Sequence, residues 1–427
     1  MTLGSLPRCP RLSGASAAWF LAVVILISAC GGGGSTTPSR LRPGAFVRIY
    51  SSLPSAGPDA ARAAQIANGI ALALSQHHHR AGLYQVRYVG LDAGSAAGGS
   101  PSAGATAVAR NARIAATDPS AVFYIGELSS NANRISIPIL NEAGIPQLSP
   151  TATAIGLTAP IAGNPHSEPP YYPSGSRTFT RLLPNDAVQA LASLSALSTA
   201  RCSRVALAYD RPGLTLAQLV RADAPRFGIT VAATVPVGDV SGRLRLPDVV
   251  RSTRADCVQI SGSATQALTQ LTARVHAAAP LVRVFLGSSG MCVPAWTNPR
   301  HGGVPSAMDS LLMCTRPTLP LDSYPGAAPF RRAYAAAFGA TAVPDVYALL
   351  GYTAMQLGLG AVASLGRRGD ERSAVLRWLF DTSHATPIGT FSFDRYGDTS
   401  LDVYGLYKVG VNGNPHYATT LHPRGGF

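Results

Sequence analysis

Short apolar runs alternate with helical periods along most of this chain, and this alternation restricts the fold more than any other feature. After the first run, Ile66, Ile70 and Leu74 recur at helical spacing with polar residues between them. Strand–helix–strand units of this length form right-handed parallel sheets. The runs that predict strands are rich in β-branched and aromatic residues, and they are residues 46–50, 86–89, 121–125, 205–209, 257–260 and 282–286.

The alternation occurs once before and once after a stretch rich in Pro, Gly and Ser, residues 159–176. We therefore expect an α/β fold with two doubly wound parallel-sheet lobes. Apolar residues make up 46 % of the 427 residues and charged residues 13 %, so each lobe can bury a core. The same composition excludes a disordered polar chain and a coiled coil.

The N-terminus predicts export. Arg8 and Arg11 precede an apolar run, residues 17–27, that has the length of a signal-peptide core. The small residues before Cys30 resemble the lipobox of bacterial lipoproteins, so we expect residues 1–29 to be a signal peptide and Cys30 to be lipidated. Residues 30–44, rich in Gly and Ser, would then tether an extracytoplasmic body to the membrane. The alternative is an ordinary signal peptide with an incidental cysteine.

Export favours disulfides, and four cysteines remain in the mature chain. Cys202 lies just before one predicted strand and Cys257 begins another, so they lie at the same end of a parallel sheet, and we expect them to pair. Cys292 and Cys314 would close a loop rich in Pro and Gly. Four cysteines allow three pairings, and free buried thiols are the remaining alternative.

The formal net charge of +14 does not indicate nucleic-acid binding. Almost all of the basic charge is arginine, with Lys408 the only lysine, and the arginines are dispersed rather than gathered between stacking aromatics. A Walker loop and a Ser-x-x-Lys site each require a lysine in a fixed motif, and the sequence contains neither motif.

Enzyme signatures are also missing from the sequence: it contains no Gly-x-Ser-x-Gly elbow, no His-Glu-x-x-His and no Gly-x-Gly-x-x-Gly after a strand. Three successive histidines, His77 to His79, would point about 100° apart on a helix and could not bind one metal ion together. We interpret them as a solvated helix end. We therefore expect no enzyme activity, no cofactor and no metal.

Hydroxyl residues follow two predicted strands. Ser129 and Ser130 come shortly after Ile125, and Thr151 and Thr153 come shortly after Leu148. In parallel sheets, ligands bind outside the carboxyl ends of the strands. The simplest interpretation is helix capping, but two such loops that converge on one crevice can also bind a carboxylate.

Several blocks resemble the leucine/isoleucine/valine-binding protein family, the periplasmic-binding-protein receptors of branched-chain amino acid ABC importers. The resemblance runs over nearly the whole mature chain. The blocks are residues 46–49, 68–69, 118–119, 125–126, 129–130, 138–146, 149–153, 352–357, 387–394 and 397–398.

The resemblance implies two lobes, joined by a hinge of three crossings, that close on a ligand. It implies a first lobe of residues 45–178 plus 316–386 and a second of residues 179–315 plus 387–427. By similarity, the hydroxyl block would hold the α-carboxylate and α-amino group of an amino acid. Its expected ligand-binding residues in the first lobe are Ser129, Ser130, Thr151, Ala152, Thr153 and Arg62, and those in the second are Asp210, Ser263 and Ser289.

The second lobe departs from the family pattern, because Gly287 to Gly290 stand where the amino acid receptors place an acidic ammonium anchor. An ammonium buried without a carboxylate is costly to desolvate. We therefore expect a monomeric lipoprotein receptor that captures a small polar solute, an amino acid or a related carboxylate or amide, and delivers it to an ABC permease and its ATPase. The alternative is a sensor of the same fold that acts through a signalling partner.

Overall fold

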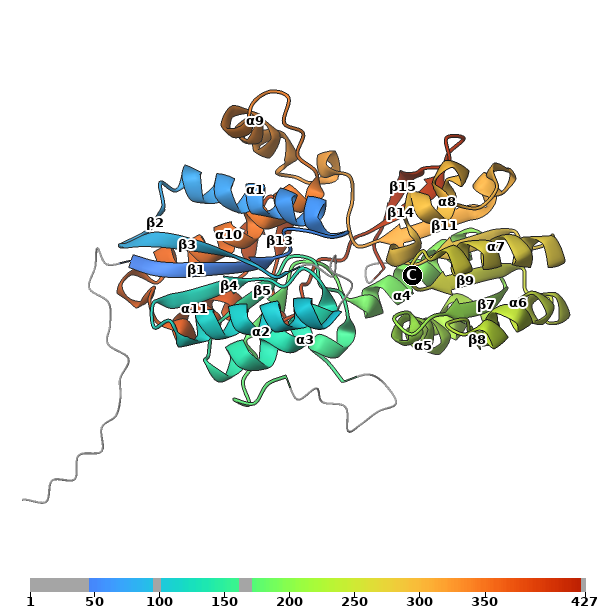
Figure 1. Ribbon diagram of the computed structural model, residues 1–427, viewed down its shortest axis with the longest axis horizontal. Coiled ribbons are helices and arrows are strands. Elements are labelled where there is room, and N and C mark those ends of the chain that lie inside the picture. The colour runs from blue at the N-terminus through green and yellow to red at the C-terminus, as the bar shows by residue number, and fades with distance from the viewer. Residues whose placement is uncertain (1–45, 95–100, 161–170, 424–427) are drawn as a thin grey trace, which may run out of the picture. The chain divides into compact units, whose positions relative to one another are not determined.

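Two sheets organise the chain, and the computed structural model describes residues 46–94, 101–160 and 171–423. The first sheet has the strand order β2-β3-β1-β4-β5-β6 (Figure 1). All neighbours in it are parallel except β2 and β3. Its strands are β1 (Phe46–Leu53), β2 (Arg80–Ala81), β3 (Tyr84–Asp92), β4 (Ala121–Ile125), β5 (Gln147–Ser149) and β6 (Phe179–Arg181).

Helices cover both faces of the first sheet. α1 (Ala60–Gln76) and α10 (Val346–Ser364) pack against one face, and α2 (Pro101–Thr117) and α3 (Ser130–Glu142) pack against the other (Figure 1). The last part of the chain thus returns to complete the first core. The other elements of this region are α9 (Ala327–Phe338), α11 (Arg372–Asp381), β12 (His384–Thr386) and β13 (Gly389–Phe391).

Helix α10 is apolar on all sides because it is the central core helix of this region. Among the described residues it is the one helix long and apolar enough to cross a bilayer, but 72 % of its apolar window is buried in the protein. It packs closely on α1, where a Cβ on Gly351 would meet the Ile66 carbonyl oxygen at 2.1 Å. Glycine is therefore required at this helix crossing.

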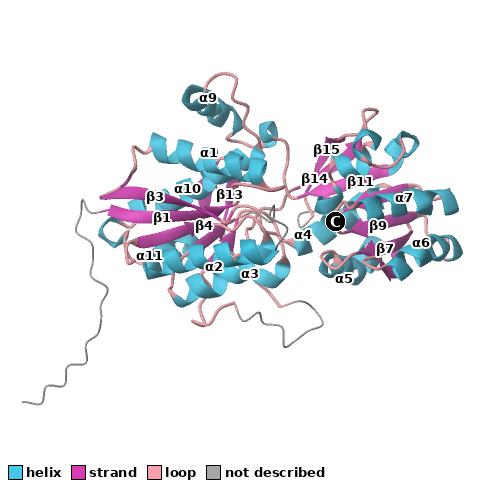
Figure 2. Ribbon diagram, viewed as in Figure 1, coloured by secondary structure: helices cyan, strands magenta, loops and turns pink. Residues whose placement is uncertain are grey.

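The second sheet has the order β15-β14-β11-β10-β9-β7-β8. Five of its strands are parallel, as expected, but β14 and β15 form an antiparallel hairpin on one edge (Figure 2). Its strands are β7 (Arg204–Tyr209), β8 (Thr230–Pro236), β9 (Cys257–Ser261), β10 (Val284–Gly287), β11 (Leu312–Arg316), β14 (Tyr404–Val409) and β15 (Pro415–Leu421).

Helices also cover both faces of the second sheet. The helices α4 (Asp186–Thr199) and α5 (Leu214–Asp223) share one core, and α6 (Val240–Ser252), α7 (Gln266–Ala278) and α8 (Pro294–Thr297) share the other. The short 3₁₀ helices of the described chain are η2 (Ile155–Leu157), η3 (Ala224–Phe227), η4 (Ser289–Met291), η5 (Pro299–His301), η6 (Ser306–Leu311), η7 (Leu321–Ser323) and η8 (Gly366–Arg368).

Both expected disulfides are present, Cys202–Cys257 and Cys292–Cys314. They lie on opposite faces of the second sheet, because Cys202 and Cys257 belong to the core under α4 and α5 whereas Cys292 and Cys314 belong to the core under α7 and α8. The first disulfide ties neighbouring strand starts, as the sequence predicts.

The chain passes between the two sheets three times, after β6, after β11 and before β14. Two segments lie beyond the lobe limits expected from the sequence. β6 pairs with β5 of the first sheet, so this sheet extends past residue 178. Phe391 and Phe393 belong to the first core although they follow residue 386.

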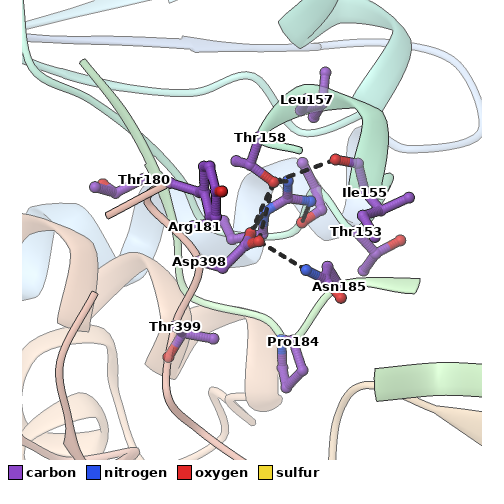
Figure 3. A network of polar contacts seen from close by, with 12 residues as sticks. Thr153, Ile155, Leu157, Thr158, Thr180, Arg181, Pro184, Asn185, Asp398 and Thr399 are labelled. Carbon is purple, nitrogen blue, oxygen red and sulfur yellow. Dashed lines mark hydrogen bonds and ion pairs between the residues drawn. The ribbon is translucent and has the colours of Figure 1, made fainter. Parts of the chain in front are cut away.

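A buried ion pair joins two of the crossings (Figure 3). Arg181, at the end of β6, is fully buried, and its Nε lies 2.7 Å from Oδ1 of Asp398. Arg181 also donates to Thr158 Oγ1 at 2.7 Å, and Asp398 accepts from Asn185 Nδ2 at 2.7 Å. Each charge is therefore paired and hydrogen-bonded, as burial of charge requires.

Candidate functional site

Two loops meet at the carboxyl edge of the first sheet, as the sequence predicts. Ser130 accepts hydrogen bonds through its Oγ from the backbone N–H groups of Thr153 (3.3 Å) and Ala154 (3.2 Å). Thr151 donates from its Oγ1 to the Leu128 carbonyl oxygen. The hydroxyls therefore tie the β4–α3 loop to the β5–η2 loop, which brings Ser130, Thr151 and Thr153 together.

Hydrogen-bonding capacity is left over at this meeting point. Ser130 and Thr153 are partly exposed. The Ser130 hydroxyl already accepts two bonds, so its own proton remains to be donated to a ligand. The Thr151 hydroxyl donates within the protein and keeps its lone pairs. Ser129 caps α3 by accepting from Ala132 N at 3.2 Å, which is the capping role that the sequence also allows.

Buried polar side chains form hydrogen bonds with the backbone of these loops. The carboxamide oxygen of Asn133 accepts from Glu127 N at 2.9 Å and from Gln147 Nε2 at 3.0 Å. Ser149 donates to the Glu127 carbonyl oxygen at 2.7 Å and accepts from Ala152 N at 3.0 Å. The loop backbone is therefore fixed by side chains that are themselves fully buried.

An acid that the sequence analysis missed lies against this site. Asp186 is the first residue of α4, and its N–H donates to the Thr153 carbonyl oxygen at 2.9 Å. Burial raises the pKa of the Asp186 carboxyl to about 6, and a hydrogen bond with the Thr153 side chain opposes the rise. The sequence indicates Asp186 only through its position, because it directly follows Asn185, the residue that caps the start of the helix.

A pocket of about 300 Å³ opens beside the first loop. Of the predicted ligand residues, Ser129 lines it, whereas Ser130, Thr151 and Thr153 do not. Its walls are mainly apolar and come from the ends of β1 and β3 and from α2 and α3. The apolar lining includes Pro54, Ala93, Val108, Leu128 and Ile135, and the polar lining includes Asp59, Glu127, Ser129 and Asn131.

Glu127 is a buried acid in the pocket wall, with 1 % of its surface exposed. The Tyr124 hydroxyl donates to its Oε1 at 2.8 Å. Burial raises the pKa of the Glu127 carboxyl to about 8, and hydrogen bonds from Ser52 and Tyr124 oppose the rise. The carboxyl is therefore mostly protonated at neutral pH. A single Glu after a Gly gives no sequence signal of this environment.

Arg62 lies on α1, next to the start of α10. Its guanidinium lies 3.2 Å from Oδ1 of Asp59 and 4.8 Å from the ring centre of Tyr347. Arg316 Nη2 lies 3.4 Å from the hydroxyl of the same tyrosine. Two arginines thus flank Tyr347. The Arg62–Asp59 ion pair is exposed, so it contributes little to the stability of the fold.

The predicted second-lobe residues meet at the carboxyl edge of the second sheet. Asp210 accepts from Gly213 N at 2.9 Å and from Ser263 N at 3.0 Å, so each carboxylate oxygen binds a backbone N–H. Ser288 exchanges hydrogen bonds with the backbone of Gly262, and Ser289 begins η4. Asp210 therefore holds two loops together.

The histidine cluster matches the solvated helix end expected from the sequence. His77 to His79 are exposed after α1. Within the described ranges, no group of three or more His, Cys, Asp or Glu side chains could hold a metal ion.

No protein-family model matches this chain, and no curated protein matches it. Solved structures do share its fold. An ABC transporter substrate-binding protein from Desulfitobacterium hafniense in complex with Leu has a TM-score of 0.64 at 20 % identity and covers 87 % of this chain and 100 % of its own. The leucine-binding protein LivK from Thermotoga maritima has a TM-score of 0.64 at 20 % identity, with coverage of 88 % and 99 %.

A solute-binding protein of an ABC transporter from R. palustris, in complex with benzoate, has a TM-score of 0.62 at 17 % identity and covers 88 % of this chain and 96 % of its own. The similarity spans both sheets in each case. The chain therefore has the type I periplasmic-binding-protein fold, the fold of solute-binding proteins of ABC importers.

Proposed function

We propose that this protein is an extracytoplasmic, lipid-anchored solute-binding protein that delivers a small polar solute to an ABC importer. The observation that carries the proposal is the convergence of the two first-sheet loops, where Ser130 ties Thr153 and keeps a proton to donate. These loops follow the carboxyl ends of the strands, which is where ligands bind in parallel sheets of this kind. We assign β1–β6, α9–α11 and β12–β13 to the first lobe, and β7–β11 and β14–β15 to the second.

A carboxylate is the ligand group that this edge fits best. Hydroxyl and backbone N–H donors form charge-assisted hydrogen bonds with carboxylates. The solved relatives bind leucine, benzoate or hydroxybenzoate, all of which carry a carboxylate, and only leucine among them carries an ammonium. On the second edge, the Asp210 carboxylate is already engaged with backbone N–H groups. We therefore propose a carboxylate solute whose recognition does not require an ammonium.

Mass spectrometry of denatured protein would identify a co-purified solute, and calorimetry would then test a panel of benzoate, 4-hydroxybenzoate, leucine, isoleucine and valine. We expect leucine and its homologues to bind weakly. Each lost charge-assisted bond should weaken binding by roughly tenfold or more. Ser130→Ala and Thr153→Ala should therefore weaken the binding of the tightest ligand. His78→Ala, at an exposed residue, should not. Submicromolar leucine binding would overturn the ligand class, and an effect of His78→Ala alone would overturn the site.

Ligand binding should also close the two lobes, because polar groups from both would be satisfied together only in the closed state. Small-angle scattering should show a smaller radius of gyration with the bound solute than without it. Identical curves at saturating solute would contradict a hinged receptor.

The lipid anchor rests on the sequence around Cys30, which lies outside the described residues. Cys30→Ser should move the protein from the membrane fraction to the soluble fraction and abolish labelling by a fatty acid. Unchanged membrane association would contradict acylation at this residue.

A further inference from the structure

One buried side chain binds the loop that carries Thr153. The guanidinium of Arg181 donates from Nη1 to the Ala154 carbonyl oxygen at 2.9 Å and to the Ala152 carbonyl oxygen at 3.4 Å. These two residues lie directly before and after Thr153. The N–H groups of Thr153 and Ala154 already donate to Ser130, so Arg181 fixes the same short segment from its carbonyl side.

The other two nitrogens of this guanidinium bind Thr158 and Asp398. Nη2 donates to Thr158 Oγ1 at 2.7 Å, and Nε lies 2.7 Å from Asp398 Oδ1 (Figure 3). Thr158 Oγ1 lies 3.0 Å from both carboxylate oxygens of Asp398. Because a guanidinium is planar and presents its donors in a fixed fork, one rigid group sets the positions of the loop and of Asp398 together.

The crossing before β14, which carries Asp398, is packed tightly against β6. The Arg181 N–H donates to the Gly397 carbonyl oxygen at 3.1 Å. Gly397 has a φ of 91°, and a Cβ at this residue would collide with the Phe179 carbonyl oxygen, so glycine is required there. Asp398 also accepts from Asn185, which caps α4. Arg181 therefore connects the loop to a well-fixed part of two crossings.

We propose that Arg181 is a positioning residue of the solute site: it fixes the carbonyl groups on either side of Thr153 and thereby couples this loop to the crossing before β14. Arg181 is fully buried, so it acts through the loop and not by contact with the solute. The proposal rests on the proposed function, because the loop is a solute site only if Ser130 and Thr153 bind a carboxylate.

Loss of Arg181 should displace the loop. The Ala152 and Ala154 carbonyl oxygens would each lose a donor. A buried acceptor without a donor costs free energy, so the loop would move until these oxygens found new partners. Thr153 lies between the two carbonyls and would move with them. Solute recognition requires groups whose positions are set in advance, so this displacement should lower the affinity for the solute.

A purely structural ion pair is the competing explanation. In that case Arg181 serves only to compensate the buried charge of Asp398, and removal of both charges together should leave the loop and its affinity for solute unchanged. A positioning residue behaves differently, because the carbonyl groups of the loop lose their donor even when no unpaired charge remains. This difference decides the experiment.

Three variants separate the two explanations. Arg181→Met, Asp398→Leu removes both charges and so avoids an unpaired buried acid. Arg181→Lys keeps the positive charge but not the planar fork. Arg372→Met is the matched control, because Arg372 also donates to backbone carbonyl oxygens, those of Ala121 and Ala143 at 2.8 Å each, but at the opposite edge of the same sheet.

Hydrogen–deuterium exchange of the full chain without added solute measures the position of the loop. In the double variant, the backbone amides of residues 151–158 should exchange roughly fivefold faster or more than in the wild-type protein, because two hydrogen bonds to the loop are lost. Arg372→Met should leave their exchange unchanged. Should the double variant fail to fold, Arg181→Lys gives the same comparison. Unchanged exchange of this segment in the folded variants would overturn the proposal.

Calorimetry with benzoate and with leucine measures the consequence for binding, at a temperature where every variant is folded. The probe that binds the wild-type protein should bind roughly fivefold more weakly or less to the double variant and to Arg181→Lys. Arg372→Met should bind it as the wild-type protein does. Equal affinity of the wild-type protein and the double variant would overturn the positioning role.

The two measurements also separate this inference from the proposed function. Faster exchange of the loop, without binding of either probe that depends on Ser130, would contradict the proposed carboxylate site and support the role of Arg181 in the loop. Binding that depends on Ser130 but is unchanged in the double variant would contradict the role of Arg181 alone.

Discussion

The carboxyl edges of the two sheets hold their loops in different ways. On the first edge, buried side chains of Asn133, Gln147 and Ser149 bind the loop backbone from below. On the second edge, Asp210 clamps two loops through backbone N–H groups. The second sheet also carries two disulfides. The first edge depends on noncovalent polar contacts, and the second region is reinforced by covalent cross-links.

This difference indicates where ligand selectivity is built. A network of buried side chains can present unusual groups, such as the protonated Glu127, because the low dielectric that surrounds it shifts pKa values. Backbone clamps and disulfides give rigidity but offer few side-chain groups to a ligand. Substitutions in each region should therefore have different effects on stability.

The largest effect should come from Glu127→Gln at high pH. The folded-state pKa of about 8 lies above the unfolded value of about 4.3, so the acid costs the folded state increasing free energy as pH rises from 4 to 8. At about 1.4 kcal/mol per pKa unit, Glu127→Gln should raise the free energy of unfolding by up to roughly 5 kcal/mol at pH 9. Near pH 4 it should change little.

Urea unfolding at several pH values measures this effect. The exposed Asp248→Asn provides a matched control, because removal of an exposed acid should not produce the same pH trend. A pH-independent effect of Glu127→Gln would show that the carboxyl titrates normally.

The next largest effect should come from Arg181→Met. Removing one partner of a buried ion pair leaves Asp398 buried and unpaired, which should cost roughly 3 to 5 kcal/mol. Arg251→Met, in the exposed pair with Asp248, should cost less than about 1 kcal/mol. Denaturant unfolding of both variants tests the contrast, and the double variant Arg181→Met, Asp398→Leu should recover part of the loss.

Removal of a disulfide should lower the free energy of unfolding by an amount similar to, or slightly smaller than, the loss expected for Arg181→Met. The Cys202–Cys257 bridge spans a sequence separation of 55 and the Cys292–Cys314 bridge spans 22. The chain-entropy relation gives roughly 4 and 3 kcal/mol, so paired Cys→Ala variants should be destabilised in that order. Thermal unfolding with and without reductant measures the loss, and a protein insensitive to reductant would contradict this role.

The smallest effects should come from the helix caps. Ser129 caps α3 on the first edge and Thr265 caps α7 on the second, through side-chain oxygens that accept from N–H groups. Ser129→Ala and Thr265→Ala should each cost about 1 kcal/mol. Ser129→Asn, which can also cap, serves as control. A much larger cost on the first edge alone would mean that Ser129 also supports the loop network.

The parallel character of both sheets and both disulfide pairs were predicted from the sequence, whereas β8 and β11 were not among the predicted strands. Runs such as Val205 to Tyr209 are apolar throughout because both faces of the strand are buried, and the pattern is visible locally. The β14–β15 hairpin was not predicted. β15 is an edge strand without a buried residue, and the mostly buried β14 includes Gly405 and Lys408, which weaken its apolar pattern. β6 was missed because it has only three residues.

Part of the candidate site was also visible in the sequence. The Ser and Thr residues after Ile125 and Leu148 were predicted to converge, and Ser130 does contact the backbone of Thr153. Asp186 was missed because it reaches Thr153 only through the first crossing. Arg181 and Asp398 are far apart in the chain, and no local pattern predicts that such residues become a buried pair.

The α/β alternation, the four cysteines that pair and the hydroxyl residues after two strands depend on local spacing and composition, so they are visible in the sequence. The chemistry of those residues depends on tertiary packing, which brings distant parts of the chain together. Burial raises the pKa of Glu127, and its surroundings include residues distant in the chain, such as Ser52 and Ser149. The same dependence on distant neighbours makes Asp210 a loop clamp and Arg181 the link between two crossings.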